Sequence, residues 1–138
     1  EYQKKVDAMN NVLQMKIDTA ALIENYYGTD IYAVKAGVLN KQSKVITGIK
    51  GKFIIYDIFG KKIHTVYVER TGTIKQGEDM VSGELSALLS EDNKTALRET
   101  PFSKIKWEWL PEIIVFDDDT KMEAGTKPAN PLKDPFED

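Results

Sequence analysis

Three consecutive aspartates, Asp117, Asp118 and Asp119, form the most prominent carboxylate cluster of the sequence, and Thr120 follows them. Carboxylate oxygens are ligands that Ca²⁺ and Mg²⁺ prefer. In extended backbone only Asp117 and Asp119 face the same way, whereas Ca²⁺ takes about six to eight oxygens. The interleaved glycine and the ligand spacing of a calcium loop are also missing. We therefore interpret the cluster as a solvated turn at a strand end, and keep Asp117 and Asp119 as candidate metal ligands.

His64 is the only histidine and so the only candidate for a histidine-based catalytic triad. It lies beside Thr65 and Val66 in a stretch typical of a strand, and the sequence identifies no serine or aspartate partner for it. No G-x-S-x-G, Walker or dinucleotide-binding glycine motif is present. A carboxylate pair for glycoside cleavage stays open, because distances between acids are invisible in a sequence. We predict no catalytic residue, no cofactor and no enzyme activity.

Aromatic residues offer a second kind of chemistry, the recognition of peptides or sugars. Tyr26 and Tyr27 fall in a polar, glycine-containing stretch, residues 25–30, which predicts an exposed loop. They are the candidate recognition surface, with simple packing of the loop as the alternative. Trp107 and Trp109 alternate with Lys106 and Glu108, which favours burial of both tryptophans in a core.

Composition sets the broad class. The 138 residues are 41% hydrophobic and 30% charged, as in a globular domain that can bury a sizeable core. A net charge of −3 without a basic stripe predicts no nucleic-acid partner. The absence of cysteine excludes disulfides and cysteine-ligated zinc, and no apolar run approaches the roughly 20 residues of a membrane span. Because the chain starts at Glu1 without Met, we expect a segment upstream of it.

The elements that must position these residues are mostly strands. Tyr2, Val6 and Met9 are spaced as on a helix, which predicts a short helix over residues 1–11. From Leu13 the apolar residues alternate, which favours a strand, although a helix continuing to Gly28 fits the spacing too. Further strands are predicted over 31–39, 81–88, 105–109 and 113–116, with turns at 69–73 and Gly77 and an interruption at Pro111. One helical turn is predicted near 95–98 in the crossover.

The stretch from Ile49 to Val68 is the strongest hairpin signal, with its turn at Phe59–Lys62. Phe53 and Ile55 share one face with Gly51, but the other face is apolar too. This pattern predicts either a strand covered on both sides or a bulge near Gly48 or Gly51. Asp57 is expected to accept hydrogen bonds from backbone N–H groups around Gly60.

Within this hairpin, Phe53-Ile54-Ile55-Tyr56-Asp57 resembles the F-x-L-Y-D motif of the FxLYD family of bacterial extracytoplasmic domains, with Ile55 at the leucine position. The next residues, Ile58 to Ile63, are similar to a D-x-x-G-x-x-I hairpin of related lipoprotein domains, and Asn40 lies where that group often has an asparagine in a turn. The resemblance covers residues 31–68. It implies an immunoglobulin-like fold, location in the bacterial cell envelope, periplasmic or extracellular, and often a lipidated cysteine upstream. It carries over no catalytic residues.

We therefore predict an all-β, immunoglobulin-like antiparallel β-sandwich of about seven strands with a short N-terminal helix. The expected organisation is a helix or linker over 1–11, the sandwich over 12–119 and a flexible tail over 120–138. The first functional hypothesis is a non-catalytic envelope module that binds an unknown protein or envelope component. One alternative is a metal-dependent hydrolase or cation-binding domain at Asp117, and another is a cytosolic adaptor.

Overall fold

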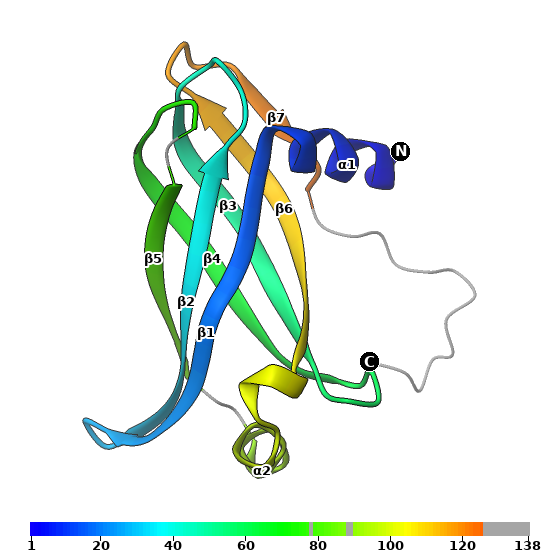
Figure 1. The fold of residues 1–138 in the computed structure, drawn as a ribbon, viewed down its shortest axis with the longest axis vertical. Coiled ribbons are helices and arrows are strands. Elements are labelled where there is room, and N and C mark those ends of the chain that lie inside the picture. Colours follow the sequence, from blue (N-terminus) through cyan, green and yellow to red (C-terminus); the bar gives the residue numbers. More distant parts are fainter. Residues whose placement is uncertain (78, 88–89, 126–138) are drawn as a thin grey trace.

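The computed structural model describes residues 1–77, 79–87 and 90–125. Within these residues, seven strands form two antiparallel sheets that face each other, and a short helix precedes them (Figure 1). The predicted all-β sandwich with its N-terminal helix is confirmed. The elements are α1 (Tyr2–Val12), β1 (Leu13–Tyr26), β2 (Thr29–Asn40), β3 (Ile46–Tyr56), β4 (Lys62–Ile74), β5 (Asp79–Ala87), α2 (Glu91–Glu99), the 3₁₀ turn η1 (Phe102–Lys104), β6 (Lys106–Phe116) and β7 (Lys121–Glu123).

The strand order is immunoglobulin-like. One sheet has the order β1-β2-β5 and the other β4-β3-β6-β7, and every pair is antiparallel. These sheets correspond to strands A-B-E and C-F-G of an immunoglobulin constant domain, except that the fourth strand pairs with β3 instead of joining β5. As a result β4 and β5 are the edge strands on one side of the sandwich, and no backbone ladder joins them.

The helix gives way to a strand where the spacing of buried residues changes. Val6, Met9 and Val12 are buried at helical spacing, and Leu13, Met15 and Ile17 are then buried at strand spacing. The alternative of one helix running to Gly28 is wrong. Alternation fits the sequence after Leu13 because it places three apolar side chains of β1 on the sheet face that meets the core.

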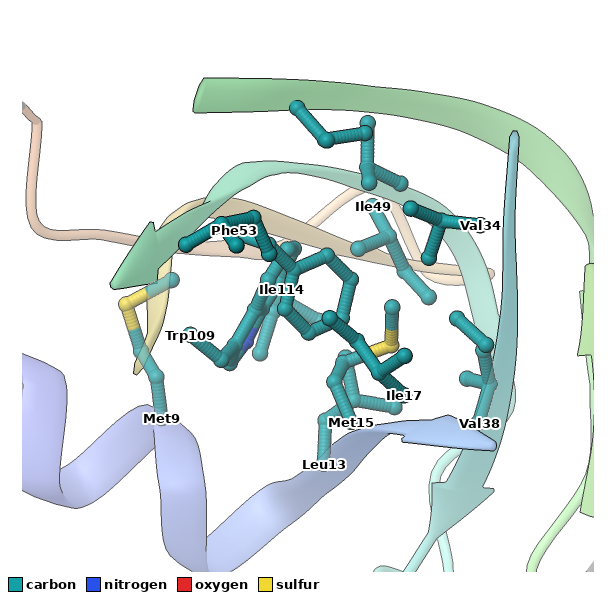
Figure 2. Packing of buried hydrophobic residues seen from close by; sticks show 14 of the residues in the cluster. Met9, Leu13, Met15, Ile17, Val34, Val38, Ile49, Phe53, Trp109 and Ile114 are labelled. Carbon is teal, nitrogen blue, oxygen red and sulfur yellow. The ribbon is translucent and has the colours of Figure 1, made fainter. Parts of the chain in front are cut away.

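The core lies between the sheets (Figure 2). Phe53 and Ile55 on β3 and Ile114 on β6 have no exposed surface. The Phe53 ring lies 4.8 Å from the Trp109 ring and 5.7 Å from the Trp107 ring, centre to centre. The predicted burial of the tryptophans is therefore confirmed, with Trp109 buried and Trp107 partly buried against the same cluster.

The β3–β4 hairpin is confirmed, and so are its bulges. The register of β3 shifts between Ile46 and Gly48 against β4, and between Lys50 and Gly51 against β6. Asp57 Oδ1 accepts backbone hydrogen bonds from Phe59 and Lys61, both at 2.9 Å, as predicted for this carboxylate. After the shift near Gly48, Ile49, Gly51, Phe53 and Ile55 alternate on one buried face, and Ile54 on the other face is also buried. The shift at Gly51 places its extra residue, Glu112, on β6, so β3 does not change faces there.

Several predicted boundaries are wrong. Residues 69–73 are not a turn, since β4 continues to Ile74. Pro111 does not end the strand, since β6 runs from Lys106 to Phe116 and Pro111 pairs with Gly51, next to the register shift at Glu112. Residues 121–123 form β7 and pair with β6, so this part of the expected tail belongs to the sheet. The crossover contains the nine-residue helix α2. Residues 126–138 of the expected tail and Leu88 at the end of a predicted strand lie outside the described residues.

Asn40 links three segments at the end of β2. Its side chain is fully buried, donates to the carbonyls of Lys44 at 2.8 Å and Ile74 at 2.9 Å, and accepts from the Gln42 amide at 2.9 Å. We expect Asn40→Ala to lower the free energy of unfolding by about 2 kcal/mol, because it leaves buried backbone groups without partners. Urea denaturation measures this loss. The exposed Asn10, changed to alanine, is the control, and equal effects of the two changes would refute the role.

Candidate functional site

The aspartate cluster forms a turn between β6 and β7. Asp118 accepts hydrogen bonds from the Thr120 amide at 3.1 Å and from the Thr120 hydroxyl, and it pairs with Lys44 at 3.1 Å. The hydrogen bonds from Thr120, with the Lys44 contact, lower the pKa of Asp118 to about 2. Asp119 has a left-handed backbone, with φ 67°. In the part of the chain that the structure describes, no three His, Cys, Asp or Glu side chains converge as metal ligands would. The carboxylate in the middle of the cluster therefore stabilises its own turn.

His64 meets a serine that sequence reasoning could not identify. Its Nε2 lies 2.8 Å from the Ser86 hydroxyl, across the edge strands β4 and β5. The imidazole is buried and its ring lies edge-on to Tyr32, at 6.2 Å between ring centres. The Tyr32 hydroxyl has no hydrogen-bond partner among the described residues, and burial raises its pKa to about 12. These buried groups form a polar contact between the sheets. None of them lines a described cavity.

The His64 contact predicts a pH dependence of stability. Burial, helped by the nearby charge of Lys62, lowers the pKa of His64 below its ordinary value. The unfolded chain therefore binds a proton at this site before the folded protein does, so stability falls as pH drops below about 6.5, by at most about 1.4 kcal/mol per pH unit. Urea titrations between about pH 8 and 5 measure the slope. His64→Gln is expected to flatten it, and an unchanged slope in this variant would contradict the assignment.

Tyr26 and Tyr27 lie at the turn of the β1–β2 hairpin, where the predicted loop is found. Tyr27 is 92% exposed and Tyr26 is 42% exposed, and their rings meet edge to face at 4.7 Å. Asn25, Tyr27 and Gly28 all have left-handed backbones, with φ of 63°, 47° and 84°. A bulky residue such as tyrosine rarely adopts this conformation, which costs about 1 kcal/mol or more outside glycine.

Helix α2 supports this hairpin from the side. Lys94 pairs with Asp30 at 3.0 Å, and Arg98 pairs with Glu24. Asp30 also accepts the Asn25 amide at 2.9 Å, and this bond and Lys94 lower its pKa. Ser90 caps the N-terminus of the helix, since its hydroxyl accepts the Asn93 amide, and the helix packs Leu97 into the core. Both strands leading to the turn are thus tied to a helix that is fixed on the sandwich.

A second exposed pair that the sequence reading did not single out lies on the β3–β4 turn. Phe59 is 87% exposed and Ile58 is 53% exposed. Asp57 holds the backbone of this turn, and Gly60 closes it with a φ of 80°. The signal was an apolar residue, Phe59, inside the predicted turn, with the apolar Ile58 directly before it. Figure 1 shows both hairpin turns and α2 at the same end of the sandwich. The two turns lie on opposite sides of α2 in this view, and we call their exposed residues Tyr26, Tyr27, Ile58 and Phe59 together the tip surface.

No family model matches this chain, and neither does any curated protein sequence. Among solved structures, it is similar to Northeast Structural Genomics Consortium target SoR45, with a TM-score of 0.49 and 17% identity over 94% of this chain and 96% of that one. It is also similar to target BeR40, a Bordetella pertussis protein provisionally named ApaA, with a TM-score of 0.45 and 12% identity over 80% and 85% of the two chains. Such similarity says nothing about function. Neither described helix has the length and apolar character that a bilayer crossing requires.

Proposed function

We propose that this domain is a non-catalytic immunoglobulin-like module of the bacterial cell envelope, and that it binds a protein or another envelope component through the tip surface. The envelope setting rests on the resemblance of Phe53–Asp57 to the F-x-L-Y-D motif. The binding role rests on the exposed side chains of the two turns. An immunoglobulin-like sandwich commonly presents recognition residues on loops at its ends, held by rigid strands.

The observation that carries this proposal is the conformation of Tyr27. A turn with φ of 47° at this position would form more easily with glycine or asparagine. The sequence has a tyrosine there, with 92% of its surface in water, so the residue adds no burial to the fold. An exposed side chain that the fold does not need, on a backbone that disfavours it, supports a role outside folding. Tyrosine is also a residue that binding surfaces favour.

The neighbouring contacts make the surface suitable for recognition. Lys94 and Arg98 restrain the strands that carry Tyr26 and Tyr27, so the ordering cost of binding is small. The Asp57 hydrogen bonds restrain Phe59 in the same way. In this proposal the aspartates around Asp118 and the His64–Ser86 pair stabilise the fold and take no part in chemistry.

The experiment compares binding of purified domains to the envelope fraction of the encoding bacterium by co-sedimentation. The test variant carries Tyr26→Ser and Tyr27→Asn, because asparagine suits the left-handed backbone and leaves the turn intact. The control is Tyr67→Ser, which removes a 70% exposed tyrosine from the face of β4. We expect the tip variant to lose binding and the control to keep it. Equal binding by both variants, with equal stability, would refute the proposal.

The alternative of a cytosolic adaptor makes a different prediction about the gene. An envelope module requires an export signal upstream of Glu1, and a lipoprotein requires a cysteine at its cleavage site. Fractionation of the bacterium with an antibody to this domain decides between the two. Recovery of the native protein in the cytosol would leave the tip surface as a binding site but would overturn the envelope setting.

A further inference from the structure

A cavity of about 290 Å³ lies between the two sheets, on the side where β4 and β5 are the edges. It is at the Ile74 end of β4, away from the turn at 57–61, so it is separate from the tip surface. Its apolar wall comes from four strands: Met15 on β1, Ala36 and Val38 on β2, Ile49 on β3, and Val68 and Ile74 on β4. These six residues are buried and belong to the core cluster.

The cavity opens to solvent along β4 and β5, where Arg70, Thr71, Gly72 and Gly83 of its lining are exposed, and its inner part reaches the core. Protein interiors pack about as densely as organic crystals, and their voids are rarely larger than a water molecule. An engineered apolar cavity of about 150 Å³ is known to stay dry and to take up benzene. Ala36 contributes to the space here, because it lies between the larger Val34 and Val38 on the inner face of β2. A cavity of this volume can hold an apolar molecule larger than benzene.

The mouth of the cavity is polar and carries a balanced charge. Arg70 continues the inner face of β4 after Val66 and Val68, and its Nε pairs with Glu84 on β5 at 2.7 Å. Its Nη2 also donates to the Gly83 carbonyl. Beside this pair, β4 has two residues, Gly72 and Thr73, where β3 has only Thr47, so the edge strand carries one extra residue and its ladder is interrupted there. The arginine and the glutamate offset each other, which leaves no net charge to select an anion or a cation.

We propose that this cavity binds a neutral, mainly apolar small molecule, whose polar end faces the Arg70–Glu84 pair. An apolar wall with a few polar groups at one side is the usual make-up of a small-molecule site. The pair joins two edge strands, β4 and β5, that no backbone ladder connects, so it can open without breaking a sheet. This ligand site is independent of the tip surface, and either one can fail without the other.

The probe for this site is N-phenyl-1-naphthylamine, which is neutral and fluoresces in apolar surroundings. We expect saturable binding of one probe per protein. Ala36→Leu should weaken the affinity by about tenfold or more, because the added side chain occupies the cavity. Ala33→Leu makes the same change on the outer face of β2 and should bind as the wild type does. Absence of saturable binding, or equal affinity of the two variants, overturns the proposal.

A measurement on the unchanged protein covers the case in which Ala36→Leu does not fold. The methyl resonance of Met15, which lines the cavity, should shift on probe addition, whereas that of the buried Met9 should not. A probe bound at the tip surface would shift neither resonance, and that outcome also overturns the cavity assignment. Tyr27→Asn should leave probe binding unchanged, which separates this test from that of the proposed function.

Discussion

Replacing Gly51 with alanine is expected to lower the free energy of unfolding by about 4 kcal/mol, at the upper end of what a single overpacked position costs. A Cβ at this position would lie 2.5 Å from the Trp109 ring and 2.7 Å from the Leu110 carbonyl oxygen. The ring could turn aside, but the carbonyl belongs to the backbone of β6 and can move only with the strand. One methyl group therefore displaces part of the sheet.

Urea denaturation followed by tryptophan fluorescence measures this effect. Gly83→Ala on β5 is the matched control, because a Cβ there would have no atom within 4 Å. The control is expected to change stability by less than about 0.5 kcal/mol. A similar loss in both variants would mean that the contact with β6 is not the cause.

Phe53→Ala is expected to lower the free energy of unfolding by about 4 kcal/mol as well, for the opposite reason. Phe53 has no exposed surface, and its ring packs against both tryptophans of β6. Removing the ring leaves a cavity in the middle of the core and removes the aromatic contacts. The residue is the first of the motif at Phe53–Asp57, so the motif contributes to stability through burial.

The control for Phe53 is the other phenylalanine of the same hairpin. Phe59 is 87% exposed, and Phe59→Ala should change stability by less than about 0.5 kcal/mol. Both changes remove the same atoms, so any difference between them comes from the surroundings. A large loss in Phe59→Ala would show that the tip surface helps to hold the fold and would weaken its assignment to binding.

The parts of the fold that local pattern determines could be predicted. Alternation after Leu13 identified β1, and the glycines at 48 and 51 marked the two places where the register between β3 and β6 shifts. Asp57 was predicted to hold its turn because a carboxylate beside a glycine has local amide partners. In each case the side chain acts on neighbours a few residues away.

The errors arise where a distant strand decides the local structure. Residues 69–73 resemble a turn, but pairing with β3 keeps them in β4. Residues 121–123 have too few apolar side chains to predict a strand, and β6 supplies their pairing partner. Pro111 lies within β6 next to the register shift at Glu112, the kind of irregular position where proline occurs in strands.

The candidate site could be predicted only in part. The loop position of Tyr26 and Tyr27 follows from local composition, but the left-handed backbone of Tyr27 depends on the register of the whole hairpin. The His64–Ser86 contact and the Arg70–Glu84 pair join strands of different sheets, so no local sequence pattern predicts them.

That this domain binds through its tip surface is tested most directly by photo-crosslinking in the organism that encodes it. The photoreactive residue p-benzoylphenylalanine replaces Tyr27 in one strain and Tyr67, on the face of β4, in another. We predict a discrete adduct from position 27 that the position 67 strain lacks. No adduct from position 27, or the same adducts from both positions, would contradict the proposed binding role.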